Sequence, residues 1–251
     1  MGNLIAVAGK GGTGKSTISA LIIRSLLKNN KTPVLAIDAD PNSNLPESIG
    51  IDIENSIGSV LSDFIRNKGE IPQGMTKQAF LEFKFHQILK EGKDLDMMVM
   101  GCPEGPGCYC AANSMLKGYY EDLSKNYKYV VVDNEAGMEH LSRKTTSEID
   151  YLLFVSNYSL KALKTIERLS DMIDELRLNV GKRYLIVNQT PNEMEQSFVD
   201  EINRIEIPYL GNIVKDDLIE EYDVKGVPLT ELPDSSKAVE SIEKMLKNII
   251  E

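Results

Sequence analysis

The sequence has no tryptophan, few aromatic residues and too little positive charge to balance its acidic residues. Its 28 Lys and Arg residues stand against 38 Asp and Glu residues, which gives a formal net charge of -10. A surface with this excess repels nucleic acids and anionic lipids, and no run of basic residues is longer than two. We therefore expect no nucleic-acid partner and no membrane partner.

Long apolar runs and a cysteine framework are also missing. No stretch approaches the ~20 apolar residues that a membrane-spanning helix needs. The first residues lack the basic segment that opens a secretory signal. Only three cysteines are present, all between Cys102 and Cys110, which excludes a disulfide framework and favours thiols kept for chemistry. We expect a cytoplasmic protein.

Short apolar runs alternate with helical patterns along the whole chain. Continuous apolar strands separated by helices predict an α/β fold in which helices flank both faces of a mostly parallel central sheet. We expect a single domain over residues 1–251, with ligands at the carboxyl ends of the strands. The predicted strands are 4–8, 34–37, 95–100, 129–132, 151–155, 184–187 and 209–213. The predicted helices are a first one with its apolar stripe at Ile18, Leu21, Ile22 and Leu26, then 56–66, 76–91, 112–125, 159–178, 193–203 and 235–250.

A glycine-rich loop between the first strand and the first helix matches a phosphate-binding motif. Residues 9–16 read GKGGTGKS, which fits G-x-x-x-x-G-K-[ST] in the required strand–loop–helix context. Glycines allow successive backbone N–H groups to curl around phosphate oxygens, and the positive end of the helix faces the same anion. Lys15 is predicted to reach the β- and γ-phosphates, and Ser16 to bind Mg²⁺. The predicted ATP contacts in this P-loop are Gly11, Gly12, Thr13, Gly14, Lys15, Ser16 and Thr17.

Carboxylates follow two of the predicted strands. Asp38 and Asp40 come at the end of the second strand, where they can hold the water shell of Mg²⁺ or orient an attacking water. A loop-capping pair is the alternative. Asp133 follows the apolar run 129–132 in a Walker B pattern, so we expect it in the Mg²⁺ shell. Gly137 fits a switch that responds to the γ-phosphate.

Asn188 ends the predicted strand 184–187 at the same edge of the sheet. Its amide offers both a hydrogen-bond donor and an acceptor to a purine base. It is therefore predicted to bind the adenine of ATP, and a capping role is the alternative.

Two of the three cysteines form a C-x-C pair in a loop rich in glycine and proline. Cys108 and Cys110 face the same side of an extended backbone, so both thiolates can reach one ion. A disulfide between them is excluded by strain. A two-fold axis beside the loop would supply two further thiolates, and four thiolates suit Zn²⁺ if tetrahedral or Ni²⁺ if square-planar. Burial as small apolar residues is the alternative, and it is our prediction for Cys102.

The loop from Lys10 to Thr17, KGGTGKST, has a second lysine and resembles the deviant Walker A motif. Proteins with this motif are dimeric ATPases related to MinD, ParA and the nitrogenase iron protein. The resemblance implies a MinD-like P-loop fold in which Lys10 crosses a dimer interface to the nucleotide of the other chain. It also implies that Asp40 positions the hydrolytic water and that residues 207–216 line the base. The alternative for Lys10 is a solvated lysine that touches the phosphate of its own chain.

The C-x-C pair together with residues 133–143, DNEAGMEHLSR, resembles nickel-insertion ATPases of the CooC type over essentially the whole chain. Those proteins mature carbon monoxide dehydrogenase, and the similar AcsF type serves acetyl-CoA synthase. The resemblance implies a Mg²⁺-dependent ATPase, a homodimer linked by ATP or metal, and a Zn²⁺ or Ni²⁺ site between its chains. It assigns no role to Glu135 or His140.

Two other classes of protein remain open. An electron-transfer ATPase resembling the nitrogenase iron protein would share a [4Fe–4S] cluster between chains, but residues 133–140 contain no cysteine beside the switch. A spatial organiser resembling MinD or ParA would use a basic amphipathic helix at a membrane. The charges around the apolar stripe of residues 236–251 are balanced instead.

Overall fold

A seven-stranded sheet forms the centre of the molecule. The computed structural model describes residues 2–67, 71–101, 119, 122–136 and 148–250. The strands lie in the order β3-β2-β4-β1-β5-β6-β7, and every pair of neighbours is parallel. All seven predicted strands are confirmed: β1 (Asn3–Gly9), β2 (Val34–Ala39), β3 (Leu95–Val99), β4 (Tyr129–Asn134), β5 (Ile149–Asn157), β6 (Val180–Thr190) and β7 (Tyr209–Val214).

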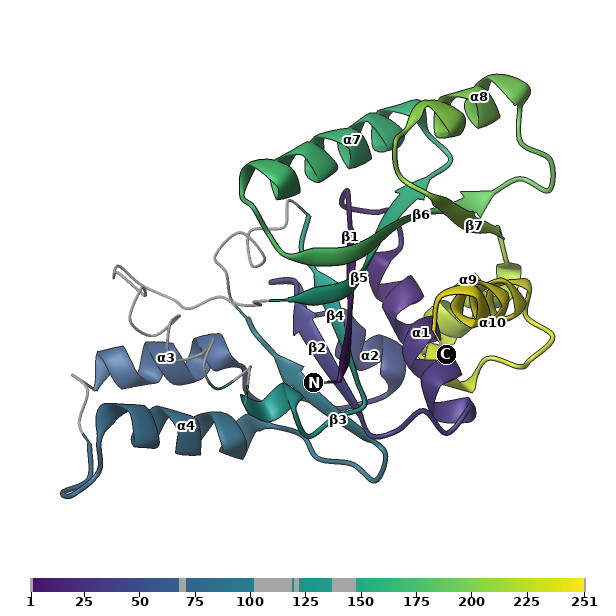
Figure 1. Ribbon diagram of the computed structural model, residues 1–251. Coiled ribbons are helices and arrows are strands. Elements are labelled where there is room, and N and C mark those ends of the chain that lie inside the picture. Colours follow the sequence, from purple (N-terminus) through teal and green to yellow (C-terminus); the bar gives the residue numbers. More distant parts are fainter. Residues whose placement is uncertain (1, 68–70, 102–118, 120–121, 137–147, 251) are drawn as a thin grey trace.

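Helices cover both faces of the sheet, as the apolar patterns predict (Figure 1). Side chains alternate along β1, so Leu4, Ala6 and Ala8 face one layer and Ile5 and Val7 face the other. The first layer contains α3 (Ile57–Arg66), α4 (Lys77–Ile88), α7 (Leu160–Glu175) and α8 (Gln196–Arg204). The second contains α1 (Lys15–Lys28), α2 (Leu45–Ile49), the 3-10 helix η1 (Leu229–Glu231) and α10 (Lys237–Ile249).

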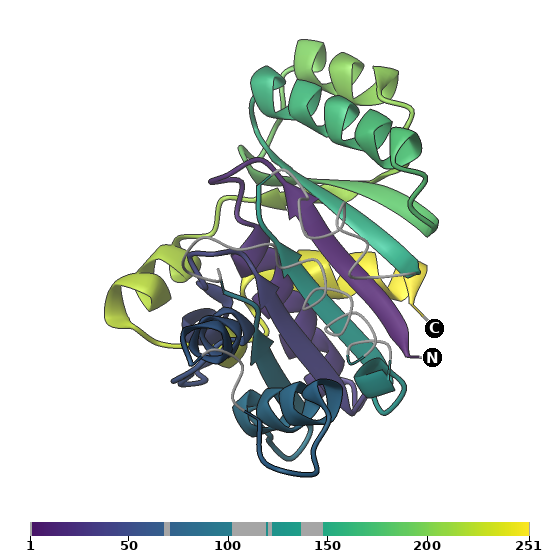
Figure 2. The same ribbon diagram turned by 90° about the vertical axis from the view of Figure 1, so that its left-hand side faces the viewer.

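Three elements were not predicted from the sequence: the short helices α2 and η1, and the longer helix α9 (Asp217–Lys225). α2 has only five residues, η1 has three, and α9 has no buried residue and therefore no apolar stripe to detect. Figure 2 shows α9 standing away from the sheet. The predicted helix 76–91 was too long, because Lys90 pairs with Met97 as an isolated bridge. Most of the predicted helix 112–125 lies outside the described residues.

No helix in the described part of the chain is both long enough and apolar enough to cross a membrane. The apolar face of α10 is buried, including Ile242, Met245 and Ile249, which pack in the same layer as α1.

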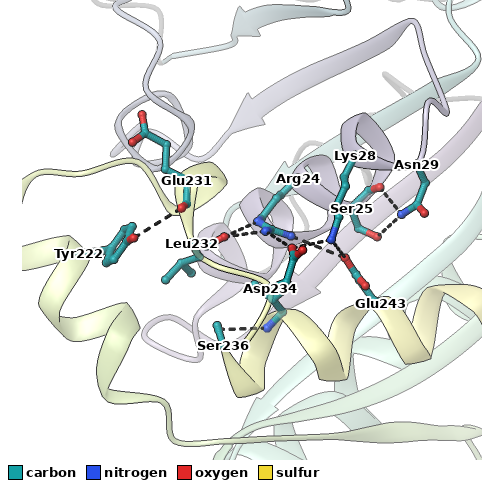
Figure 3. Close-up of polar contacts among 11 residues, drawn as sticks. Arg24, Ser25, Lys28, Asn29, Tyr222, Glu231, Leu232, Asp234, Ser236 and Glu243 are labelled. Atoms are coloured by element: carbon teal, nitrogen blue, oxygen red, sulfur yellow. Dashed lines mark hydrogen bonds and ion pairs between the residues drawn. The ribbon is translucent and has the colours of Figure 1, made fainter.

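A buried arginine joins α1 to the segment that leads into α10 (Figure 3). The Arg24 side chain donates from Nε and Nη2 to the Leu232 carbonyl oxygen at 3.0 and 2.6 Å. Its Nη2 also lies 2.8 Å from Asp234 Oδ1, and Lys28 Nζ lies 2.5 Å from the same oxygen. These hydrogen bonds, first from Arg24 and then from Lys28, lower the pKa of Asp234. Glu243 on α10 completes the cluster at 3.7 Å from Arg24 Nη1.

Replacing Arg24 by alanine is expected to lower the free energy of unfolding by about 2–4 kcal/mol. The change leaves the buried Leu232 carbonyl without its charged donor, and a buried acceptor that loses such a donor is costly. Lys28→Ala is the matched control, because Lys28 contacts the same carboxylate from a solvent-exposed position and should cost much less. Urea unfolding measures both variants. Equal losses of stability would contradict this account of the cluster.

Candidate functional site

The carboxyl edge of the sheet carries a cavity of about 520 Å³. It lies over the start of α1 and is closed on its sides by the segment after β2, by the end of β4 and by the α9–η1 connection. Seven residues predicted from the sequence line it: Gly11, Gly12, Gly14, Lys15, Ser16, Thr17 and Asp40. The remaining residue of the predicted ATP-binding loop, Thr13, is buried and does not line the cavity.

The loop between β1 and α1 has the backbone geometry of an anion-binding turn. Gly12 and Gly14 have φ values of 77° and 89°, which favour glycine. The Thr13 hydroxyl donates to the Lys10 carbonyl at 2.8 Å and so closes the turn. Lys15 is the first residue of α1 and is only 7% exposed. Its ammonium and the positive end of α1 therefore face one cavity, which suits a polyphosphate.

Asp133 supplies a buried carboxylate next to Ser16, which lines the cavity. It is fully buried, and neither carboxylate oxygen has a hydrogen bond of normal geometry among the described residues; the same is true of the Ser19 hydroxyl. Burial raises the pKa of Asp133 to about 7, although the nearby Ser16 hydroxyl and the Lys15 charge oppose the rise. Burying a charged carboxylate is costly. Together with the Ser16 hydroxyl it forms a set of hard oxygen ligands that fits Mg²⁺.

The Asp38 carboxylate accepts hydrogen bonds from the loop that follows β2. Its two carboxylate oxygens accept hydrogen bonds from the backbone N–H groups of Asp40 and Leu45, each at 2.9 Å. Burial raises the pKa of Asp38 to about 6, and its neighbour in strand register is Asp133. These bonds correspond to the loop-capping alternative. A role in the Mg²⁺ shell stays a prediction.

Asp40 and Lys10 differ from these buried groups in being accessible. Asp40 lines the cavity, and its Oδ1 accepts from both the backbone and the side chain of Asn42 at 2.9 Å. Lys10 is exposed and does not line the cavity of its own chain. Asp40 is thus positioned to meet a water beside a bound phosphate, and the Lys10 side chain is free to reach a second molecule.

Asn188 contacts the P-loop itself. Its side chain is 4% exposed, its Nδ2 donates to the Thr13 carbonyl at 3.0 Å, and its Oδ1 accepts from the Gln189 backbone at 2.9 Å. Sequence analysis did not anticipate the bond to Thr13. Contact with adenine stays a prediction, as does the lining of the base by residues 207–216, where Asn212 donates to Thr190 Oγ1 at 2.8 Å.

The structure adds cavity residues that the sequence patterns did not single out. Glu47 and Ser48 come from α2, and Asp223 and Val227 from the end of α9 and the segment after it. Both helices lack a detectable apolar periodicity, so no signal marked these side chains. Glu135 also lines the cavity, immediately after β4.

The predicted soft-metal site is not among the described residues. Cys102, Cys108, Cys110, Gly137 and His140 all lie outside them. Within the described ranges, no group of three or more His, Cys, Asp and Glu side chains is arranged to hold an ion. The strand that leads to the cysteines is described, and the Met100 N–H donates to the Asp38 carbonyl at 2.8 Å. Met100, two residues before Cys102, therefore lies beside Asp38.

The raised pKa values predict how stability depends on pH when no divalent metal is bound. Unfolded carboxyls titrate near pH 4, but the folded state keeps its protons on Asp38 and Asp133 up to about pH 6 and 7. The folded state therefore binds more protons in this window, and its stability falls as pH rises from about 4 to 7. Asp133→Asn should remove on the order of 3 kcal/mol of this decline.

Urea unfolding in EDTA between pH 4 and 8 checks this expectation. A decline of the same size in the wild type and in Asp133→Asn would contradict the assigned effect of burial.

The strand–loop–helix turn, the buried Asp133 and the polar cavity define a P-loop nucleotide-binding protein. Comparison with known sequences names the family. The chain belongs to the CobQ/CobB/MinD/ParA nucleotide binding domain family, whose model matches residues 4–229. Its members include ATP-binding P-loop proteins of the MinD and ParA type.

Three relatives illustrate the range of this similarity. An uncharacterized ATP-binding protein of Methanocaldococcus jannaschii is 37% identical over 249 residues, which cover 98% of each chain. The carbon monoxide dehydrogenase accessory protein CooC of Rhodospirillum rubrum is 27% identical over 240 residues, 91% of this chain and 89% of that protein. The septum site-determining protein MinD of Pyrococcus horikoshii, solved with Mg-ADP, superposes with a TM-score of 0.72 at 16% identity, over 100% and 97% of the two chains. This superposition supports the fold.

Proposed function

We propose that the protein is a Mg²⁺-dependent ATPase whose nucleotide cycle controls a homodimer that inserts nickel into carbon monoxide dehydrogenase or acetyl-CoA synthase. The observation that carries the ATPase assignment is the buried Asp133 carboxylate beside Ser16 and Lys15, two residues that line the cavity. A carboxylate, a hydroxyl and an ammonium grouped at a helix amino terminus match the charges of a Mg²⁺–triphosphate.

In this proposal, different residues of the chain bind the phosphates, hold the metal ion and orient the attacking water. Backbone N–H groups of the P-loop and the Lys15 ammonium bind the β- and γ-phosphates. Ser16 and Asp133 would hold Mg²⁺, which would neutralise charge on the phosphate oxygens. Asp40 orients a water whose oxygen bonds to the γ-phosphorus while the bond to the bridging β–γ oxygen breaks, giving ADP and phosphate.

Dimer formation follows from the different positions of the two P-loop lysines. Lys15 is buried in its own site, whereas Lys10 is exposed beside the same loop. In our proposal Lys10 reaches the phosphates bound by the other chain, so ATP stabilises the pair of chains and hydrolysis releases it. This arrangement agrees with a phosphate site that has a strongly acidic rim, including Glu47, Glu135 and Asp223, because an added cation offsets that charge.

The nickel assignment rests on the cysteine pair and on similarity. CooC of R. rubrum, a carbon monoxide dehydrogenase accessory protein, is similar over 91% of the chain. In the proposal Cys108 and Cys110 of two chains bind one Ni²⁺ or Zn²⁺ ion as substrate for delivery. Met100, two residues before Cys102, donates its N–H to the Asp38 carbonyl on β2, and β2 also pairs with β4, which carries Asp133. Movement at the γ-phosphate can thus reach the thiolates through neighbouring strands.

The amount of Ni²⁺ or Zn²⁺ bound by variants that each lack one cysteine thiol tests this function. Wild-type protein loaded with Ni²⁺ or Zn²⁺ is expected to hold one ion per two chains, as four thiolates require. Cys108→Ser and Cys110→Ser should lose the ion and keep ATP binding. Cys102→Ser is the matched control and should keep both. Metal retained by Cys108→Ser would contradict the shared thiolate site, and bound iron with a broad visible absorption after anaerobic purification would favour the iron–sulfur alternative.

A second candidate function is spatial organisation of the MinD type. The MinD protein of Bacillus subtilis is 25% identical over 248 residues, 95% of this chain and 86% of that protein. The buried apolar face of α10 argues against using residues 237–249 as a membrane-binding helix, because that face already packs on the core. ATP-dependent sedimentation with anionic liposomes would favour this candidate over nickel insertion.

A further inference from the structure

Asn188 contacts the P-loop at Thr13 and Gly14 without lining the cavity. Neither Asn188 nor Thr13 lines the cavity, whereas Gly12 and Gly14 do. The Asn188 side chain is 4% exposed, and a Cβ placed on Gly14 would come within 2.2 Å of its Nδ2. The amide therefore packs closely against the turn that holds phosphate.

The orientation of the Asn188 amide is fixed by its two partners. Nδ2 donates to the Thr13 carbonyl at 3.0 Å, and Oδ1 accepts from the Gln189 N–H at 2.9 Å. Reversing the amide would set oxygen against a carbonyl and N–H against N–H, so these partners allow one orientation.

The bond to Thr13 in turn fixes the peptide between Thr13 and Gly14. In a trans peptide, the carbonyl of one residue and the N–H of the next point in opposite directions. Because the Thr13 carbonyl points toward Asn188, the Gly14 N–H points away from it, toward the side of the loop that carries the cavity. A reversed peptide would aim a carbonyl oxygen at the phosphate site, where it would repel an anion. Glycine tolerates both arrangements, so Gly14 itself cannot prevent the reversal.

We infer that Asn188 is a positioning residue that locks the Thr13–Gly14 peptide with its N–H toward the phosphate site. The inference rests on the proposed binding of nucleotide and assigns Asn188 an effect on phosphate that is independent of the base. The effect of the Asn188–Thr13 bond on phosphate binding can therefore be measured separately from any contact between Asn188 and adenine.

The experiment compares two ligands, Mg-ATP and inorganic tripolyphosphate with Mg²⁺, by isothermal titration calorimetry. The main variant is Asn188→Leu, which keeps the volume, excludes water and removes the donor. Loss of one hydrogen bond of this kind predicts a Kd about five- to tenfold higher, and the increase should be similar for both ligands. Asn188→Ala serves as a second variant if the leucine substitution prevents folding, which thermal unfolding reports.

Asn157 provides a matched control. It is the same residue type, pairs with Asn188 in register at the end of β5, and makes no hydrogen bond to the P-loop among the described contacts. Asn157→Leu should change either Kd by less than about twofold, because Asn157 does not line the cavity.

The outcomes separate the inference from the proposed function. A Kd that rises for ATP but not for tripolyphosphate would overturn the inference and leave Asn188 as a base contact alone. Unchanged Kd values for both ligands in Asn188→Leu would also overturn it. Wild-type protein that binds neither ligand would contradict the proposed function itself.

Discussion

Replacing Lys15 by alanine is expected to abolish Mg-ATP binding, with a Kd at least about a hundredfold higher than that of the wild type. Lys15 is buried at the start of α1, its charge acts on both Asp38 and Asp133, and its ammonium lines the cavity. Its loss leaves those carboxylates to repel a polyanionic ligand. Calorimetric titration with Mg-ATP measures the effect.

Lys28→Ala is the control for this substitution. Lys28 lies at the opposite end of the same helix and contacts Asp234 rather than the cavity. It should bind ATP as the wild type does. ATP turnover at the wild-type rate in Lys15→Ala would rule out the P-loop as the nucleotide site.

Replacing Asp40 by alanine is expected to separate binding from hydrolysis. Asp40 lines the cavity without taking part in the buried carboxylate pair, and loss of a group that orients a reacting water lowers kcat by about a hundredfold or more. The Kd for Mg-ATP should stay close to the wild-type value, and the ATP-bound dimer should persist. Single-turnover phosphate release measures the rate.

Asn42→Ala is the matched control for Asp40. Asn42 donates to Asp40 Oδ1 and lines the same cavity, so its loss perturbs the loop without removing the carboxylate. Its kcat should fall much less. If Asp40→Ala hydrolyses ATP within tenfold of the wild-type rate, another group must orient the water.

The strands and the P-loop were predictable because their physical causes are local. β1 is a continuous apolar run that ends at glycine, and a parallel strand buried on both faces has that pattern. The P-loop requires particular glycines at particular spacings, so its sequence identifies its geometry. α9 was missed for the converse reason. None of its residues is buried, and its apolar side chains Leu218, Ile219 and Tyr222 pack on the core only in part, so they form no clear apolar stripe.

The roles of individual polar residues were less predictable. Asp38 and Asp133 look alike in sequence, as carboxylates at strand ends. In the structure, backbone N–H groups satisfy Asp38, whereas Asp133 has no hydrogen bond of normal geometry among the described residues. This difference depends on how the β2–α2 loop folds back. The Asn188–Thr13 bond joins residues 175 positions apart, so no local pattern contains it. The thiolate site at Cys108 and Cys110 stays a prediction.

The molar mass of the wild-type protein with and without Mg-ATP tests the nucleotide-controlled dimer most directly. Light scattering after size exclusion is carried out on protein free of Ni²⁺ and Zn²⁺. It should give twice the 28.0 kDa chain mass with Mg-ATP and the mass of one chain with Mg-ADP. Lys10→Ala should bind Mg-ATP and remain a single chain. A wild-type protein that stays at the chain mass under every nucleotide and metal condition would contradict the account.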